Sequence, residues 1–150
     1  MKTYLTTLIS ALMLVAIMLQ ACGTSTPAAS VEQAEDALAN GHYEAAQTIC
    51  DNLVGSPDYE KLTIDELCRL SIVYVKLGEN TDNTDANIVA AARSMQKASD
   101  RDADSTALFI DAVSVEDRVR VALITAINEA RNALLSPETL EFETPDYDEE

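Results

Sequence analysis

Four aspartates in the C-terminal half of the chain have a spacing that could bind a hard cation. They are Asp100, Asp102, Asp104 and Asp111, at positions 1, 3, 5 and 12 of one segment. Carboxylates at this spacing hold Ca²⁺ in twelve-residue loops, but such loops turn on a glycine where this chain has Ser105. The sequence favours an acidic turn in which Ser105 caps the next helix, with calcium binding as the alternative.

Two cysteines, Cys50 and Cys68, could form a disulfide bond. The helical pattern described below places them on neighbouring helices, and disulfides persist in an oxidising compartment such as the periplasm. The alternative is a pair of small buried thiols, because cysteine is among the most frequently buried residues.

Catalytic groups are scarce in this sequence. His42 is the single histidine, and it lies in a predicted turn, where a general base would lack the cleft and partner that it needs. No glycine-rich phosphate loop, nucleophile motif or zinc-ligand spacing occurs. We therefore predict that the protein is not an enzyme and needs no cofactor.

Acidic residues outnumber basic ones by 26 to 10, which gives the chain a formal net charge of −16. Nucleic-acid binding depends largely on lysine and arginine contacts to phosphates, so this balance argues against DNA and RNA as partners. It also opposes flat binding to anionic lipids. Association with a membrane would therefore require an anchor.

The N-terminus has the features of a cleavable export signal. Lys2 is followed by an apolar run from Leu8 to Leu19, which has the length of a signal-peptide core and is short for a bilayer span. Directly after it stands Leu19-Gln20-Ala21-Cys22. This order resembles the lipobox of bacterial lipoproteins, in which a leucine lies three residues before the modified cysteine and a small residue directly before it.

The lipobox resemblance implies that residues 1–21 are removed as a signal peptide and that the Cys22 sulfur is lipidated. Two or three acyl chains anchor a protein stably, whereas one chain binds weakly. Residues 22–30 would form a flexible spacer. Gly23, in place of aspartate, implies sorting to the outer membrane. We therefore expect a lipid-anchored protein of the bacterial cell envelope that faces the periplasm.

The rest of the chain is predicted to be all-α, with about five helices in antiparallel pairs within residues 31–135. Trp is absent and Gly and Pro number four each, which favours helices over a β-fold. Three capping boxes predict helix starts, at Ser30–Gln33, Thr63–Glu66 and Ser114–Asp117. The predicted helices span Val31–Ala39, Tyr43–Leu53, Ile64–Leu77, Asp85–Ser99 and Val115–Leu135, with a short helical piece at Thr106–Asp111.

Apolar patterns predict which helix faces are buried. Residues 64–77 are apolar on nearly all sides, which predicts the centre of the domain. The last helix is expected to turn one stripe inward, made of Val119, Ala122, Leu123, Ala126, Ile127, Ala130 and Leu134. Residues 136–150 carry seven acids, two prolines and no cation, which predicts an acidic disordered tail.

Residues 31–100 resemble the tetratricopeptide repeat. The matching positions are Gly41, Tyr43 and Ala46 in one unit and Leu67, Leu70, Ser71, Tyr74 and Gly78 in the next. The resemblance implies stacked helix pairs with a concave surface for a partner's peptide or helix. It also implies that Cys68 lines the concave face, whereas Cys50 points into the core. A compact helical bundle is the alternative.

Together these patterns predict a lipid-anchored, non-catalytic adaptor or scaffold for a protein partner in the cell envelope. The candidate partner contacts are Lys61, Arg69 and Lys76, cations on or near the central helix of an acidic protein. Their alternative role is to solubilise the surface. The alternative function is an envelope lipoprotein that binds a ligand or calcium through its acidic loops.

Overall fold

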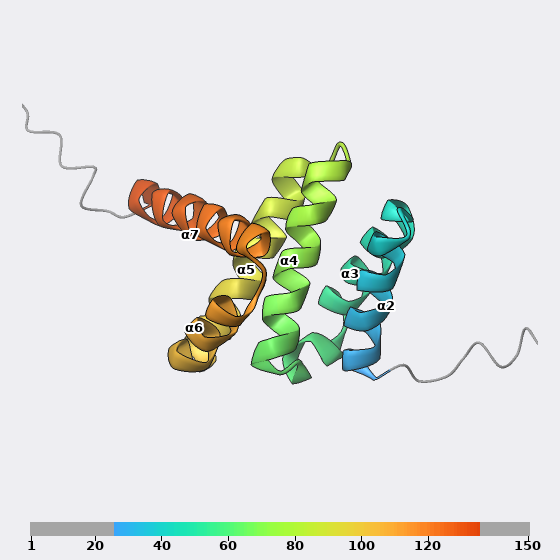
Figure 1. Ribbon diagram of the computed structural model, residues 1–150, viewed down its shortest axis with the longest axis horizontal. Helices are drawn as coiled ribbons and strands as arrows, with labels where there is room; N and C mark the ends of the chain where they lie inside the picture. The colour runs from blue at the N-terminus through green and yellow to red at the C-terminus, as the bar shows by residue number, and fades with distance from the viewer. Residues whose placement is uncertain (1–25, 136–150) are drawn as a thin grey trace, which may run out of the picture.

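The computed structural model describes residues 26–135, apart from the side chains of residues 131, 132, 134 and 135. The predicted signal segment 1–21, Cys22 and the predicted tail 136–150 lie outside the described residues. The helices are α2 (Pro27–Ala39), α3 (Tyr43–Val54), the 3₁₀-helix η1 (Pro57–Lys61), α4 (Ile64–Asn80), α5 (Thr84–Arg101), α6 (Ala103–Ala112) and α7 (Val115–Leu135) (Figure 1). Six α-helices and no strand in this part of the chain confirm the all-α prediction.

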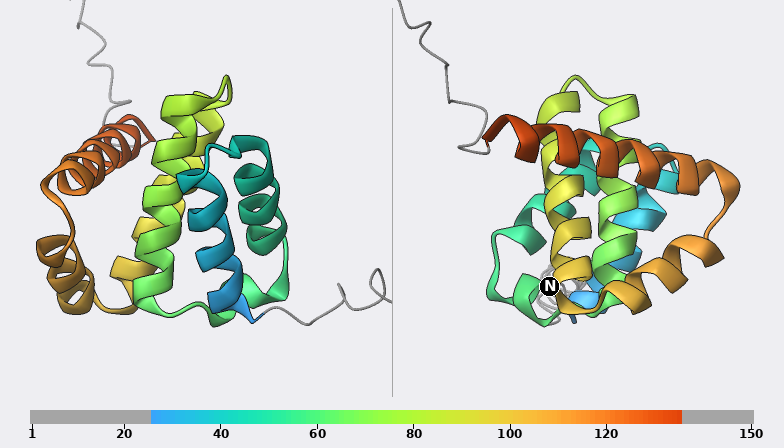
Figure 2. Two further views of the ribbon diagram at one scale, coloured as in Figure 1. Left: turned by 45° about the vertical axis from the view of Figure 1, so that its right-hand side comes forward. Right: turned by 90° about the vertical axis from the view of Figure 1, so that its left-hand side faces the viewer.

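α4 is the centre of the domain and contacts α2, α3, α5, α6 and α7. α2 and α3 form one antiparallel pair, and α4 and α5 form a second pair beside it (Figure 1). α7 crosses both helices of the second pair, and α6 connects it to the end of α5 (Figure 2). The C-terminal third of the described chain therefore packs on the second pair only and does not continue the pairing of the first four helices.

The core confirms that residues 64–77 are the buried centre. The fully or nearly fully buried side chains of α4 are Leu67, Cys68, Leu70, Ser71, Ile72, Val73, Tyr74, Val75 and Leu77. Ser71 is small enough to let α5 approach, and its hydroxyl donates a hydrogen bond of 2.8 Å to the Ala91 carbonyl. This bond satisfies a polar group that would otherwise be costly to bury.

α2 begins earlier than predicted, at Pro27 rather than at Val31. The Thr26 hydroxyl accepts a hydrogen bond from the Ala29 amide at 3.3 Å. Pro27, at the first helical position, has a φ angle already suited to a helix and no amide to satisfy. The capping box at Ser30 is therefore not the helix start, and the last part of the predicted spacer is helical.

The capping box of α4 is confirmed. The Glu66 amide donates to the Thr63 hydroxyl at 3.3 Å, and the Glu66 carboxylate accepts from the Thr63 amide at 2.7 Å. At α7 the Asp117 amide donates to Ser114 at 3.1 Å, so Ser114 caps the helix as predicted. α3 and α5 also lie within a few residues of their predicted spans, whereas η1 was not predicted.

α4 runs on to Asn80 and does not end at Leu77 as predicted. Gly78 is buried inside the helix, where α5 begins. A Cβ atom at this glycine would lie 3.5 Å from the Thr84 carbonyl oxygen, and the Thr84 hydroxyl donates to the Gly78 carbonyl at 2.9 Å. A Cβ at this distance would make an ordinary van der Waals contact, so Gly78 is not required for the approach of α5, and it does not terminate α4.

Candidate functional site

Two of the three candidate partner contacts, Arg69 and Lys61, form ion pairs with acidic side chains of this domain. Arg69 on α4 forms a bidentate ion pair with Glu35 on α2, and this hydrogen bond raises the pKa of the guanidinium. Lys61 on η1 lies 2.7 Å from the Asp58 carboxylate and remains well exposed. Arg69 thus joins the two helix pairs, and its contact with a partner remains a prediction, as does that of Lys61.

The third candidate, Lys76, belongs to a charged network that fixes α7 on α4. Its ammonium lies 2.9 Å from the Asp117 carboxylate, and Arg120 lies 3.0 Å from the same carboxylate and 2.9 Å from Glu79. Burial acts to raise the pKa of Asp117, but hydrogen bonds from Lys76, Ser114 and Arg120 outweigh it and lower the pKa overall. The four charges therefore stabilise the orientation of α7.

The two cysteines of the described chain are free thiols, so the disulfide that the sequence left open is not formed. Cys50 is buried as predicted, whereas Cys68 does not line a concave face. Its sulfur lies 4.0 Å from the Met95 sulfur in the core, because α5 covers this side of α4. Burial raises the pKa of Cys50 to about 12 and that of Cys68 to about 11, with nearby acids adding to both shifts.

The four aspartates with calcium-loop spacing do not come together. Residues 103–112 form α6 in place of a loop, and Asp102 caps this helix by accepting from the Ser105 amide at 3.0 Å and from its hydroxyl at 2.8 Å. These hydrogen bonds lower the pKa of Asp102. The cap is therefore Asp102 and not Ser105, and residues 26–135 contain no cluster of three or more acidic, histidine or cysteine side chains placed to hold a metal.

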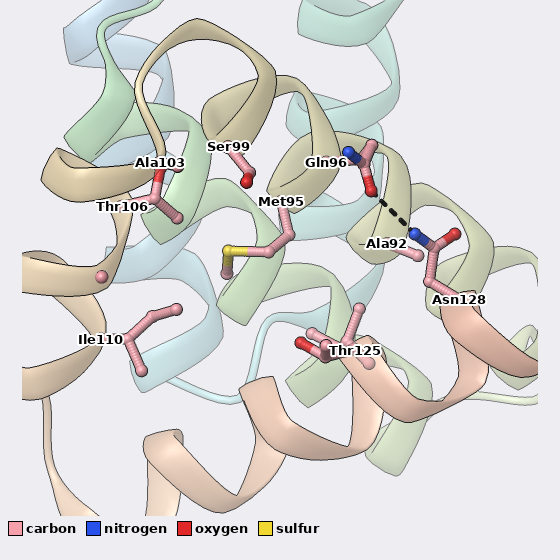
Figure 3. A pocket seen from close by; sticks show the side chains of 11 residues that line it. Ala92, Met95, Gln96, Ser99, Ala103, Thr106, Ile110, Thr125 and Asn128 are labelled. Atoms are coloured by element: carbon pink, nitrogen blue, oxygen red, sulfur yellow. Dashed lines mark hydrogen bonds between the residues drawn. The ribbon is translucent and has the colours of Figure 1, made fainter.

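A hollow of about 260 Å³ lies between α5, α6 and α7 (Figure 3). Met95 extends into it, and Asn128 donates a hydrogen bond of 2.9 Å to Gln96 across one side (Figure 3). The other lining residues are Ala92, Ser99, Ala103, Thr106, Ala107, Ile110, Ile124 and Thr125. None of these side chains is ionisable at neutral pH, so the hollow offers no group for acid–base chemistry.

The predicted inward stripe of α7 instead faces solvent, except for Leu134, whose side chain lies outside the described ones. Four large aliphatic side chains, at intervals of four residues, form what we call the outer face. They are Val115, Val119, Leu123 and Ile127, and they expose 72, 66, 52 and 38% of their surface. Ala122, Ala126 and Ala130 are exposed as well. The inward stripe was wrong because α7 has two apolar faces and the smaller one, with Val121 and Ile124, is buried.

The outer face continues into a shallow groove of about 530 Å³ between α4, α5 and α7. Apolar side chains from all three helices line it, namely Val75, Ile88, Val89, Leu123 and Ile127. Glu79 and Asp85 also line it. Of the six large hydrophobic side chains that the described residues expose, five lie on the outer face or in this groove, and the sixth is Leu108 on α6. The sequence pattern had assigned Val119, Leu123 and Ile127 of this surface to the core.

No helix in residues 26–135 combines the length and the apolarity that crossing a membrane requires. No protein-family model matches the chain, and no curated protein and no solved structure is significantly similar to it.

Proposed function

We propose that this protein is a lipid-anchored, non-catalytic interaction module of the bacterial cell envelope that binds a protein through the outer face of α7. The observation that carries the proposal is the exposure of Val115, Val119, Leu123 and Ile127 on one side of one helix. Soluble monomeric proteins seldom leave a contiguous apolar patch of this kind uncovered unless it has a binding role.

Two features of the described chain support a binding role. α7 is held from below by Val121 and Ile124 and at its N-terminal end by the ion pair between Lys76 and Asp117. The outer face is therefore presented on a supported helix, which lowers the entropy lost on binding.

The lipobox-like segment that ends at Cys22 supports the membrane part of the proposal. Removal of residues 1–21 would leave nine cations against 26 acids, a formal net charge of −17. Such a chain has little electrostatic affinity for anionic lipids, so a covalent lipid would be needed to hold it at a membrane. The anchor would raise the effective concentration of any partner in the same membrane.

The test is a photoreactive amino acid placed at Leu123 in the full chain, expressed in a bacterium and irradiated in intact membranes. We expect a discrete cross-linked product that disappears when Val119→Asp is added. The same photoreactive residue at Asn52, an exposed site on α3, serves as the matched control and should give no such product. A chain that cross-links to nothing from position 123 would contradict the proposed function.

A further inference from the structure

We propose that the acidic segment 136–150 binds the exposed side of α5, with a carboxylate of the Glu141–Glu143 stretch paired to Arg93. The inference goes beyond the proposed function, because it concerns a different face of the molecule from the outer face of α7. It is carried by the charge of α5, by the free guanidinium of Arg93 and by the place where the segment leaves the domain.

Among the described helices, only α5 carries more cations than acids. It has Arg93, Lys97 and Arg101 against Asp85 and Asp100, so its formal charge is 3 − 2 = +1. The other described helices are neutral or negative, in a chain with a net charge of −16. The three cations recur every four residues and therefore lie along one side of α5. An acidic segment meets less repulsion there than on the other described helices.

Arg93 is the cation of the described side chains that no acid or carbonyl engages. It is exposed, and its guanidinium makes no ion pair or hydrogen bond with the described residues. On the same side of α5, Lys97 lies 2.8 Å from the Glu60 carboxylate, and Arg101 donates to backbone carbonyls of residues 60 and 62. The remaining cations with described side chains are also engaged, namely Lys61, Arg69, Lys76, Arg118 and Arg120. The free planar guanidinium of Arg93 is suited to a carboxylate.

Arg93 lines a hollow of about 460 Å³ between η1, α5 and α7. Tyr59 and Val89 contribute apolar surface to it, and Val89 exposes 37% of its own surface. Residues 140–143 of the acidic segment read Leu-Glu-Phe-Glu. In an extended stretch of this kind the apolar and acidic side chains point to opposite sides. Phe142 can therefore cover the hollow while a neighbouring carboxylate reaches the guanidinium beside it.

Two carboxylates also line the hollow, and each already has its own donor. Glu60 accepts from Lys97, whose ammonium also lies 5.0 Å from the centre of the Tyr59 ring. Asp100 accepts from Gln96 at 2.7 Å. Neither acid engages Arg93, so the guanidinium is available to a carboxylate from outside the described residues.

The acidic segment begins close to this hollow. Asn128 of α7 lines the hollow, and its amide donates to Gln96 of α5 at 2.9 Å. α7 ends seven residues later, at Leu135, about 10 Å farther along its axis. Figure 2 shows the end of α7 extending past α5. Eight residues of extended chain span up to about 26 Å, so residues 136–143 can reach Arg93 without any movement of α7.

An acidic peptide of another molecule is the alternative occupant. One exposed ion pair strengthens binding by only about two- to fivefold, which is too little to hold a free peptide. The segment 136–150 is joined to the domain, and a short tether gives an effective concentration on the order of millimolar. The same weak pair is therefore formed far more often by the segment than by a free peptide, and we favour the segment.

A photoreactive amino acid in place of Phe142 tests the arrangement in the full chain, expressed in a bacterium and irradiated in intact membranes. We expect a link within the chain that peptide mapping places in residues 57–61 or 89–97. Arg93→Glu should lower the yield of this link about two- to thirtyfold, because it removes the ion pair and adds repulsion. Arg118→Glu makes the same charge change at an exposed site on α7 and is the matched control, with little effect. Circular dichroism should show normal folding for both variants.

Charge exchange tests the pairing itself. Glu141→Arg combined with Glu143→Arg should lower the yield of the link as Arg93→Glu does. Addition of Arg93→Glu to these two changes should restore the yield to near that of the original chain. A yield that Arg93→Glu leaves unchanged, or that the exchanged chain fails to recover, would overturn the inference.

The site of the link separates this inference from the proposed function. A link from position 142 to residues 115–127, to another protein or to nothing at all would overturn the binding of the segment to α5. None of these results would remove the product expected from the photoreactive residue at Leu123, which reports on a partner at the outer face. The two proposals can therefore fail independently.

Discussion

α4 and α7 are both long helices rich in aliphatic residues, yet α4 is buried and α7 leaves one apolar face exposed. α4 is enclosed by helices on all sides, and its apolar residues from Leu67 to Leu77 are nearly all buried. α7 contacts α4, α5 and α6 along one side, and its outer face from Val115 to Ile127 is open. The difference lies in the number of covering neighbours and not in the hydrophobicity of the helix itself.

We therefore expect α4 to determine the stability of the domain and the outer face of α7 to determine its association with a partner. Burial of α4 supplies the apolar contacts that hold the two helix pairs together. The outer face of α7 contributes little to folding, because its side chains are only partly removed from water. Substitutions on α4 should therefore change the free energy of unfolding, whereas substitutions on the outer face should change association and leave folding nearly unaltered.

The largest effect is expected for Leu70→Ala in the core of α4. Leu70 is completely buried, and truncation of such a side chain leaves a cavity that lowers the free energy of unfolding by about 2–5 kcal/mol. Urea denaturation followed by circular dichroism measures the change. The matched control is Leu123→Ala on the outer face, for which we expect about 0.5 kcal/mol or less. Equal losses for the two variants would abolish the distinction between the helices.

A smaller effect is expected for Asp117→Asn, where α7 meets α4. This change removes the carboxylate shared by Lys76 and Arg120 and should cost about 1–2 kcal/mol at neutral pH. The pKa of Asp117 is lowered in the folded chain, so its stabilising effect is present above the ordinary carboxylate pKa of 3.8 and is lost as the pH falls through the lower folded value.

Denaturation of Asp117→Asn and the original chain at a series of pH values tests this expectation. The two free energies of unfolding should differ above about pH 5 and converge as the pH falls below the lowered pKa of Asp117. Asp111→Asn removes an exposed carboxylate from the end of α6 and serves as the control, with no comparable dependence. A constant difference at every pH would show that the charge of Asp117 does not hold α7 in place.

The sequence predicted the helices well where the local signals were strong. The capping box at Thr63 and Glu66 and the apolar run of α4 identified the centre of the domain, because both depend on residues close together in the chain. Helix ends were predicted less well. Gly78 was taken as a stop, but it lies inside α4 and its carbonyl accepts a hydrogen bond from Thr84, a contact that the local pattern does not contain.

Ion pairs between different helices could not be predicted from the sequence, because they too depend on neighbours that the local pattern does not contain. Arg69 and Lys61 were expected to behave alike, yet Arg69 is half-buried against Glu35 of another helix, and Lys61 is exposed beside Asp58 in its own turn. We expect Arg69→Met to lower the free energy of unfolding by about 1 kcal/mol and Lys61→Met to change it by less than about 0.5 kcal/mol. Thermal denaturation measures both, and equal effects would contradict the role of Arg69 in joining the helix pairs.

The apolar pattern of α7 led us to assign the candidate binding surface to the core. α7 has apolar residues on two faces, and periodicity alone favoured the one with more large side chains. The smaller face, with Val121 and Ile124, was chosen by the fold because it fits the second helix pair while Arg120 reaches Glu79. Two apolar faces on one helix are a pattern that could have indicated one face for the core and one for a partner.

The smallest effect on folding, and the sharpest contrast with α4, is expected for Val119→Asp. Val119 exposes 66% of its surface, so a carboxylate there stays hydrated and should change the free energy of unfolding by no more than about 0.5 kcal/mol. A protein bound to the outer face would bury the same carboxylate without a counter-charge, and a buried unpaired charge is strongly unfavourable. The variant should therefore fold normally and lose the cross-linked product formed from position 123. Val121→Asp places the same group on the buried face of the same helix and should detach α7 from the core. If Val119→Asp were as destabilising as Val121→Asp, the outer face would belong to the folding core, and α7 would not differ from α4.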